Sequence, residues 1–203
     1  EMGQVQPPLP VLRFAAVYAY APAALDWFET RAADEWGSIV LRSPVWSVSE
    51  TGYYHRTMGA QIVKRLFAFD PLISVECLVP DKESAGRWEL EAVAALADAN
   101  SPIALPARPL NVDSGYLTEA KLVLATTKDR EHRLHIGRGM YAEVTLRYRK
   151  AGWQFSEWTY PDYRRDEVSV FLSAARDHLR RQLGRAVGDR THDSAGDSKR
   201  LTE

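Results

Sequence analysis

The sequence predicts a single α+β domain, in which a ferredoxin-like βαββαβ unit is extended by a β-meander and a final helix. Three observations favour this class. Short apolar, strand-forming runs alternate with two stretches of helical spacing up to residue 112. Further strand-like segments then follow without a helix between them, and a clean apolar stripe of helical period comes last. At 203 residues the chain is long enough for one ample core and too short to require two.

The first half of the predicted unit is a strand, a helix and a second strand. Residues 11–20 (VLRFAAVYAY) form a nearly continuous apolar run, as expected for a central strand that is covered on both faces. A helix is expected over 21–36, because a proline stands in its first turn and Gly37 occupies its C-cap position. Residues 38–48 (SIVLRSPVWSV) predict the second strand, and its proline marks an edge or a bulge.

The second half of the unit repeats this order. Residues 61–70 (QIVKRLFAFD) predict the third strand, after a loop that contains Tyr53 and Tyr54. Helix-forming Ala, Glu and Leu dominate residues 83–99, which predict the second helix. Residues 105–112 predict the fourth strand, interrupted by two prolines.

The remaining elements extend the sheet. Strands are expected over 122–127 and 133–136, on either side of the polar turn KDREH. In residues 140–149 apolar and polar side chains alternate, the period expected when one face packs and the other lines a pocket or meets solvent. An apolar stripe predicts the final helix from about residue 165 to residue 187.

The two ends of the chain lack the packing pattern of the segment between them. Residues 1–10 are rich in proline and are expected to form a flexible lead-in. Residues 11–187 make up the predicted domain. Residues 188–203 contain one strongly apolar residue, Leu201, and predict a disordered tail.

The composition points to a soluble, cytoplasmic protein. The formal net charge of −1 argues against a generic polyanion binder, which usually has a clear basic excess. The single cysteine, Cys77, cannot form an intrachain disulfide and is expected to be a small buried side chain. We find no signal-peptide pattern and no run of 18 apolar residues, so no membrane span is expected.

Chemically capable residues concentrate between residues 111 and 164. Asp113 stands in the turn-like sequence NVDSGY, where it either closes an Asx-type turn or presents a carboxylate as a base or metal ligand. His132 can transfer a proton near neutral pH. Glu143 is expected on the face opposite the apolar side of its strand, where it pairs with a cation or lines a pocket. The candidate catalytic residues are therefore Asp113, His132 and Glu143.

A second group of residues around these three can hold a ligand. Lys121, Lys128 and Arg133 offer charge-assisted contacts to an anion such as a phosphate, although a solvated basic face would look the same. Aromatic residues near Tyr160 can stack on a base or ring, or fill the core. The expected ligand-binding residues are Asn111, Tyr116, Lys121, Lys128, Arg133, Tyr160 and Asp162. The sequence identifies neither a metal nor a cofactor, and His132 and His135 lie on opposite faces of a strand, which argues against a two-histidine clip.

The segment 111–164 also carries motifs of a known family. It reads NVDSGYLTEAKLVLATTKDREHRLHIGRGMYAEVTLRY and is followed by WTYPDYR. In these motifs the chain resembles the bacterial domain-of-unknown-function family DUF4416. Ser114 departs from the family pattern, which usually has proline there. Gly52 stands where an aspartate commonly precedes the paired tyrosines, and its missing carboxylate weakens any metal or acid role for that loop.

The resemblance implies no established activity, although some members of the family carry a GTP-binding label. A P-loop needs the pattern GxxxxGK[ST], so that backbone N–H groups and a lysine can surround the phosphates. No glycine in this chain is followed by lysine. The sequence therefore supports no P-loop.

Three functions remain open from the sequence. The first is a small enzyme or binding protein for a phosphorylated or nucleotide-like ligand. The second is an RNA-binding module, since exposed aromatics on ferredoxin-like sheets stack bases, but the near-neutral charge and the lack of an RNP1-like run oppose it. The third is a non-catalytic protein-interaction domain. The sequence does not decide whether there is a chemical step, or the oligomeric state.

Overall fold

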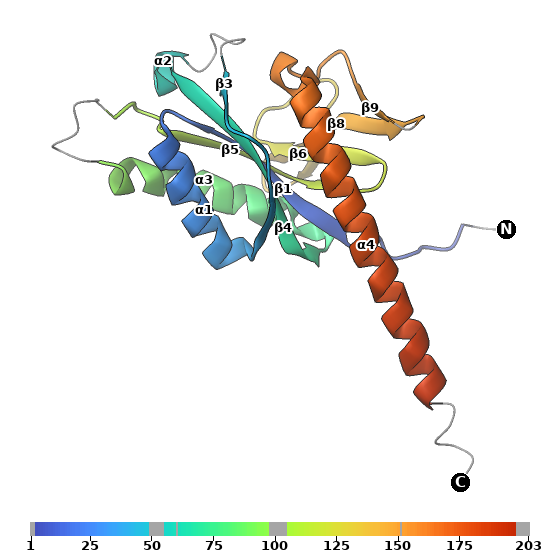
Figure 1. The fold of residues 1–203 in the computed structure, drawn as a ribbon. Helices are drawn as coiled ribbons and strands as arrows, with labels where there is room; N and C mark the ends of the chain where they lie inside the picture. Colours follow the sequence, from blue (N-terminus) through green and yellow to red (C-terminus); the bar gives the residue numbers. More distant parts are fainter. Residues whose placement is uncertain (1–2, 49–54, 60, 98–104, 151, 198–203) are drawn as a thin grey trace.

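The computed structural model describes residues 3–48, 55–59, 61–97, 105–150 and 152–197. In these residues the chain forms one large antiparallel sheet with helices on both faces (Figure 1). The elements follow in the order β1 (Val11–Ala19), α1 (Pro22–Trp36), β2 (Ile39–Arg42), β3 (Trp46–Val48), α2 (His55–Met58), β4 (Ile62–Ile73), η1 (Val75–Cys77), α3 (Leu78–Ala95), β5 (Leu110–Leu117), β6 (Lys121–Thr126), β7 (Leu134–Gly137), β8 (Met140–Arg149), β9 (Gly152–Phe155), η2 (Pro161–Arg164) and α4 (Asp166–Asp197).

The sheet has the strand order β2-β4-β1-β5-β6-β8-β7, with β3 paired to β4 and β9 paired to β8. Strand β1 is hydrogen-bonded to β4 on one side and to β5 on the other, and all nine of its residues are buried. This is the central strand that the apolar run predicted. The α+β class is therefore confirmed. The finer ferredoxin-like assignment stays a prediction, because the sheet continues past β5 and a further helix covers its second face.

Two apolar layers hold the helices against the sheet. On one face, α1 and α3 bring Phe28, Trp36 and Trp88 together over Phe67 and Phe69 of β4. Helix α4 packs on the opposite face of the sheet, through the apolar stripe that the sequence predicted. In Figure 1, α1 and α3 lie together on one side and α4 crosses the other, with its C-terminal part projecting beyond the strands.

Several element boundaries differ from the sequence-based expectation. The expected strand over 38–48 is divided into β2 and β3, because Pro44 between them has no N–H for the ladder. Helix α3 begins at Leu78, directly after η1, and not near residue 83. Strand β5 continues to Leu117, so Asp113 lies inside a strand and does not close a turn.

The C-terminal helix is longer than the sequence predicted. Helix α4 was expected to end near residue 187, and the structure continues it to Asp197, since a helix that has been nucleated by packing can propagate through its own backbone hydrogen bonds. Residues 188–197, which were predicted to belong to a disordered tail, are therefore helical. The rest of the predicted tail lies outside the described residues. Tyr53 and Tyr54 lie outside them as well. None of the helices in the described part of the chain combines the length and apolarity needed to cross a membrane.

Candidate functional site

Strands β5 and β6 are hydrogen-bonded to each other only next to the turn that joins them. Their register contains three pairs, Gly115↔Leu124, Tyr116↔Val123 and Leu117↔Leu122. Strand β5 nevertheless begins at Leu110, and β6 continues to Thr126. Gly115↔Leu124 is the pair farthest from the turn. Beyond it the two strands separate, and a cavity of about 330 Å³ lies between them. This volume is within the usual range for small-molecule sites.

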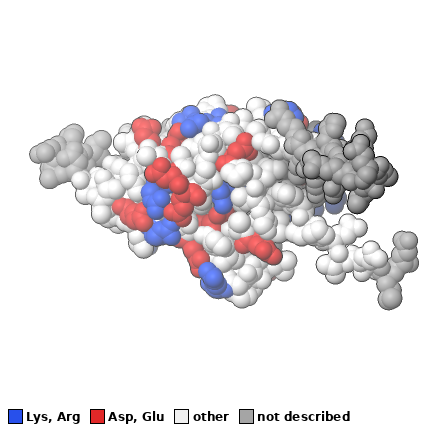
Figure 2. Space-filling model, turned by 90° about the horizontal axis from the view of Figure 1, so that it is seen from below, with Lys and Arg blue, Asp and Glu red and all other residues white. Residues whose placement is uncertain are grey.

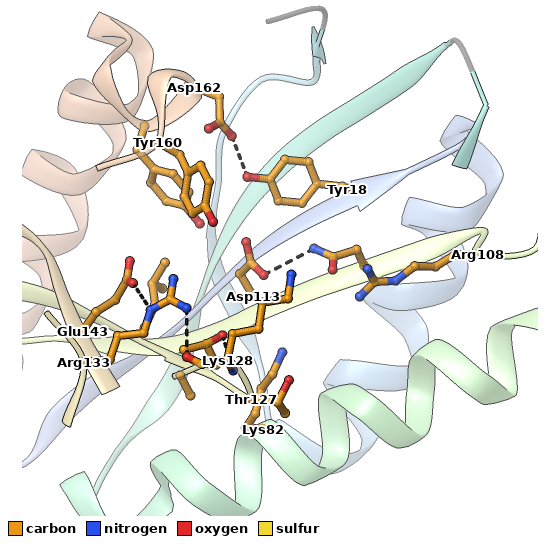
Figure 3. A pocket seen from close by; sticks show the side chains of 15 residues that line it. Tyr18, Lys82, Arg108, Asp113, Thr127, Lys128, Arg133, Glu143, Tyr160 and Asp162 are labelled. Atoms are coloured by element: carbon orange, nitrogen blue, oxygen red, sulfur yellow. Dashed lines mark hydrogen bonds and ion pairs between the residues drawn. The ribbon is translucent and has the colours of Figure 1, made fainter. Parts of the chain in front are cut away.

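Residues from the strands β1, β5, β6 and β8, from α3, from η2 and from the connecting segments line this cavity (Figure 3). The lining consists of Tyr18, Lys82, Arg108, Asn111, Asp113, residues 124–128, Arg133, Glu143, Tyr160, Asp162 and Tyr163. Seven of the ten residues proposed from the sequence are among them, namely Asn111, Asp113, Lys128, Arg133, Glu143, Tyr160 and Asp162.

Side chains of α3 take the place of a partner strand along the open edge of β5. The backbone N–H of Val112 donates to Glu89 Oε1 at 2.9 Å, and the carbonyl of Val112 accepts from Lys82 Nζ at 2.9 Å. Glu89 also accepts from Arg108 at 2.6 Å. These contacts satisfy both backbone groups of Val112, so this residue needs no hydrogen-bond partner on β6.

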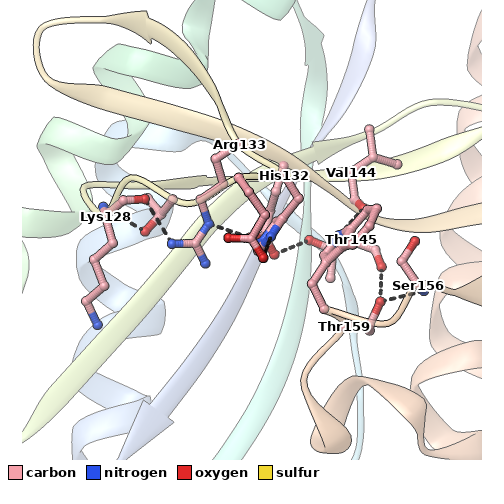
Figure 4. A network of polar contacts seen from close by, with 11 residues as sticks. Lys128, His132, Arg133, Val144, Thr145, Ser156 and Thr159 are labelled. Atoms are coloured by element: carbon pink, nitrogen blue, oxygen red, sulfur yellow. Dashed lines mark hydrogen bonds and ion pairs between the residues drawn. The ribbon is translucent and has the colours of Figure 1, made fainter.

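Glu143 is buried, and its carboxylate contacts three residues that Figure 4 labels, His132, Arg133 and Thr145. Its Oε2 accepts from Arg133 Nε at 2.8 Å and lies 3.3 Å from His132 Nε2, while its Oε1 accepts from Thr145 at 3.2 Å. Arg133 also donates to the backbone carbonyl of Lys128 at 2.9 Å. The carboxylate therefore fixes the arginine that lines the cavity. We assign Glu143 a positioning role and not the role of a free base.

His132 does not line the cavity, contrary to its expected place in the site. Its ring stacks on Trp158, with centroids 4.9 Å apart and an interplanar angle of 9°. Its Nδ1 is buried and has no hydrogen-bond partner among the described residues, although Glu131 Oε1 lies 3.8 Å away. The adjacent Arg133, which follows the turn that contains His132, lines the cavity instead.

Asp162 belongs to a buried triad with Tyr18 and Lys64. The Lys64 ammonium is completely inaccessible to solvent, and its Nζ lies 2.6 Å from Asp162 Oδ2 and 2.8 Å from the Tyr18 hydroxyl. The same hydroxyl donates to Asp162 at 2.5 Å. Burial lowers the pKa of Lys64, and the charge of Asp162 opposes this shift. The triad places the phenol of Tyr18 and the carboxylate of Asp162 at the wall of the cavity.

Asp113 is the carboxylate of the cavity with the weakest protein contacts. Its one hydrogen bond comes from Asn111 Nδ2 at 3.3 Å, and no ion pair joins it to a cation of the described residues. Burial raises the pKa of Asp113, and the positive charges of Lys82 and Lys64 oppose this effect. A carboxyl group of this kind can accept or donate a proton to a molecule in the cavity.

The raised pKa of Asp113 predicts a pH-dependent gain in stability for Asp113→Asn. Between the ordinary carboxyl pKa of 3.8 and the raised value, the folded state holds more protons than the unfolded state, so stability falls as the pH rises. The amide has no charge to desolvate, so that fall should be absent. At pH 7 the variant should be more stable by about 1 kcal/mol, as urea unfolding at several pH values would measure.

Asp177→Asn provides the control for this substitution. Asp177 is an exposed carboxylate on α4, and its replacement should change stability by less than about 0.5 kcal/mol at any pH. Equal pH profiles for the wild type and Asp113→Asn would contradict the interpretation.

Two other expected ligand contacts lie elsewhere. Tyr116 faces the opposite side of the sheet, where it packs near Leu78, and burial raises its pKa. Lys121 is exposed at the start of β6, next to the turn that precedes it. Neither residue lines the cavity between β5 and β6.

Of the lining residues that were not proposed from the sequence, Tyr18, Lys82 and Arg108 lie outside residues 111–164. They come from β1, from α3 and from the segment before β5, and no motif marks them. The sequence does contain a signal that Lys64 is buried. Lys64 lies two residues from Ile62 and two from Leu66, both apolar, so a strand period of two places this lysine on a buried face.

The described residues contain no group of three or more His, Cys, Asp or Glu side chains that could hold a metal ion. Two of the three carboxylates of the cavity are ion-paired, Asp162 with Lys64 and Glu143 with Arg133. Cys77 is a free thiol and is half-buried. The arrangement favours a polar small-molecule site.

Comparison with known proteins places the chain in one family. No curated protein and no solved structure matches it. The family model described as Domain of unknown function (DUF4416) matches residues 10–179, which include every strand, the first three helices and all the residues that line the cavity. The chain is therefore a member of the DUF4416 family.

Proposed function

We propose that this protein binds a small phosphorylated or nucleotide-like ligand in the cavity between β5 and β6. One observation carries the proposal: four cationic side chains, Lys82, Arg108, Lys128 and Arg133, line a single cavity. The whole chain has a formal net charge of −1, whereas in the cavity lining the four cations outnumber the three carboxylates Asp113, Glu143 and Asp162. Cations in a concave, partly desolvated site attract an anion more strongly than the same charges do on an open surface.

The tyrosines of the cavity support a ligand that carries a ring. Tyr18, Tyr160 and Tyr163 contribute to its wall, and Tyr160 is 51% exposed. In Figure 3, Tyr18 and Tyr160 lie on one side of Asp113, and Lys82 and Lys128 lie on the other. A phosphate held by the lysines would direct a sugar or base toward the aromatic side, where ring faces offer stacking contacts.

Asp113 is the candidate acid or base if a chemical step follows binding. It lines the cavity, and it is not held by a cation as Glu143 and Asp162 are. We therefore assign proton transfer to Asp113 alone among the three candidate catalytic residues. Glu143 would hold Arg133 in place, and His132 would support Glu143 from outside the cavity.

An RNA-binding role receives less support from the surface. Figure 2 shows acidic and basic side chains close together on the face seen from below. On α1 and α3 these charges form ion pairs, such as Arg31 with Glu35 and Arg87 with Glu91. A face of mixed charge lacks the basic excess that binding to a nucleic-acid backbone requires.

A thermal-shift screen of the purified full chain tests the proposal. The panel contains inorganic phosphate, sugar phosphates and nucleotides. A ligand at 100 times its Kd should stabilise the protein by about 2.7 kcal/mol, which is a shift of roughly 5–10 °C for a chain of this size. We expect Lys82→Ala to lose most of that shift, because the lysine lies in the cavity wall.

Lys121→Ala is the matched control, since this lysine is exposed and does not line the cavity. Each variant is compared with its own ligand-free melting temperature, so that any loss of the Lys82 hydrogen bond to Val112 is accounted for. A flat panel, or equal shifts in Lys82→Ala and the wild type, would refute the proposed site.

A further inference from the structure

Two carboxylates of the cavity keep an oxygen that accepts no hydrogen bond from the described residues. Asp162 is 2% exposed, and both of its hydrogen bonds, from Lys64 Nζ and from the Tyr18 hydroxyl, end on Oδ2. Asp113 accepts one hydrogen bond, on Oδ1, from Asn111 Nδ2 at 3.3 Å. Within the described part of the chain, Asp162 Oδ1 and Asp113 Oδ2 therefore remain available as acceptors.

Both oxygens can be reached from the cavity. Asp113 and Asp162 line it, and neither oxygen is among the side-chain atoms that are buried without a hydrogen-bond partner. An ionised carboxylate accepts hydrogen bonds and donates none, so a molecule that fills this space has to bring the donors. A carboxylate oxygen without a donor in a partly desolvated site costs free energy, and a donor on the ligand recovers that cost.

The two carboxylates lie at opposite ends of a space that has tyrosine rings at its sides. In Figure 3, Asp162 lies above and Asp113 below, and the rings of Tyr18 and Tyr160 lie to either side. The Lys64 ammonium is inaccessible to solvent, and it lies 2.6 Å from Asp162 Oδ2 and 2.8 Å from the Tyr18 hydroxyl. Because it bonds to both groups, this ammonium positions the upper end of the space.

A sugar suits this arrangement better than a nucleobase. A sugar ring carries hydroxyl groups around its rim, so it can donate to carboxylates at both of its ends while its C–H faces pack on tyrosine rings. A nucleobase has its N–H donors mainly on one edge and is joined to its own sugar at another. Each hydroxyl can also accept a hydrogen bond, and the cations Lys82 and Arg133 line the same cavity.

We infer that the ligand is a sugar phosphate, and that Asp113 and Asp162 bind hydroxyl groups of its sugar. The inference rests on the proposed function and narrows its ligand class. The phosphate lies on the side of Lys82, and the sugar lies between Tyr18 and Tyr160, so that the ligand uses both walls of the cavity. In that position Asp113 can also take the proton of a sugar hydroxyl, as a general base does.

Isothermal titration calorimetry of the full chain tests the inference. The probes are inorganic phosphate, ribose 5-phosphate, glucose 6-phosphate, the 2-deoxy and 3-deoxy forms of both sugar phosphates, and AMP. We expect at least one sugar phosphate to bind about 10-fold tighter than inorganic phosphate, because its hydroxyls donate to charged acceptors. At least one of its deoxy forms should bind about 10-fold more weakly, since a carboxylate oxygen then loses its donor. AMP should bind no tighter than ribose 5-phosphate.

Variants of Asp113 separate a hydroxyl contact from a structural role. Asp113→Ala removes the acceptor and leaves the cations in place, so at least one deoxy form should now bind as tightly as its parent. Inorganic phosphate should bind to this variant no more weakly than to the wild type. Asp113→Asn keeps an acceptor oxygen without the charge and should retain part of the discrimination. Asp177→Asn, at an exposed position of α4, should bind every probe as the wild type does.

The failures of the two proposals can be told apart. Binding of no phosphate-containing probe overturns the proposed function, and the present inference falls with it. Deoxy forms that all bind as tightly as their parents, or AMP that binds about 10-fold tighter than ribose 5-phosphate, overturn the sugar assignment and leave the proposed function intact. Equal weakening of inorganic phosphate and of the sugar phosphates in Asp113→Ala overturns the hydroxyl contact of Asp113.

Discussion

Lys64→Met should lower the free energy of unfolding by about 3–5 kcal/mol, because removing one partner of a buried ion pair leaves the other charge without compensation. The Lys64 ammonium is inaccessible to solvent, and its partner Asp162 is 2% exposed. Methionine fills a similar volume, so the loss of charge, and not a loss of packing, accounts for most of the decrease in the free energy of unfolding. For a domain of this size the melting temperature should fall by roughly 6–20 °C, as calorimetry or urea unfolding would show.

Two further variants separate this effect from general damage to the protein. Arg42→Met removes the surface pair with Glu29, whose atoms lie 2.7 Å apart, and should cost at most about 1 kcal/mol because that arginine is 40% exposed at its side chain. Lys64→Met combined with Asp162→Asn should recover much of the lost stability, since no buried charge remains. A double variant as unstable as Lys64→Met alone would show that packing, and not charge, explains the loss.

Gly115→Ala should destabilise the protein by about 3 kcal/mol, at the upper end of the range for overpacking, and should also abolish ligand-induced thermal shifts. A Cβ at this position would meet the carbonyl oxygen of Val123 and the side chain of Leu124 at 2.8 Å or less. Both contacts belong to β6, next to the last residue pair before the two strands separate. The added methyl group therefore pushes the strands apart at the base of the cavity.

Gly86→Ala is the matched control for this substitution. Gly86 lies within α3, and a Cβ there meets no atom within 4 Å. Alanine should therefore stabilise the protein by about 0.5–1 kcal/mol through its higher helix propensity. The two glycine variants should have opposite effects in the same urea titration. Wild-type stability in Gly115→Ala would mean that β5 and β6 adjust to the methyl group without cost.

Much of the cavity could be predicted from the sequence, because its central residues lie in one dense stretch. Asn111, Asp113, Arg133 and Glu143 all belong to the strands or turns of residues 111–164. The pairing partners of these strands could not be predicted in the same way. Lys82 reaches the cavity only because α3 lies against the open edge of β5, a contact between elements about 30 residues apart.

The errors within the central stretch have local causes. Strand β5 extends to Leu117, so Asp113 and Tyr116 lie on the same strand, three residues apart. Side chains at an odd spacing on a strand point to opposite faces of the sheet, which places Tyr116 on the other face. Strand β8 contains an irregularity, since Leu122 pairs with Leu146 but Val123 pairs with Val144. The uniform alternation expected over residues 140–149 is interrupted there. Glu143 precedes the irregularity and is buried at the cavity, which is one of the two positions that the alternation allowed. A single sequence gives little sign of such a bulge.

The short pairing of β5 with β6 has a mechanical consequence. Among the described residues, these three pairs form the one hydrogen-bonded ladder between the strands β2, β3, β4, β1 and β5 and the strands β6, β8, β7 and β9. Helix α4 contacts β1 and β4 in the first group and β9 in the second. The ladder and the helix therefore set the angle between two halves of the sheet, and with it the width of the cavity. A molecule bound in the cavity would be a third connection between the two halves of the sheet. The rigidity of the whole sheet would then depend on whether the cavity is occupied.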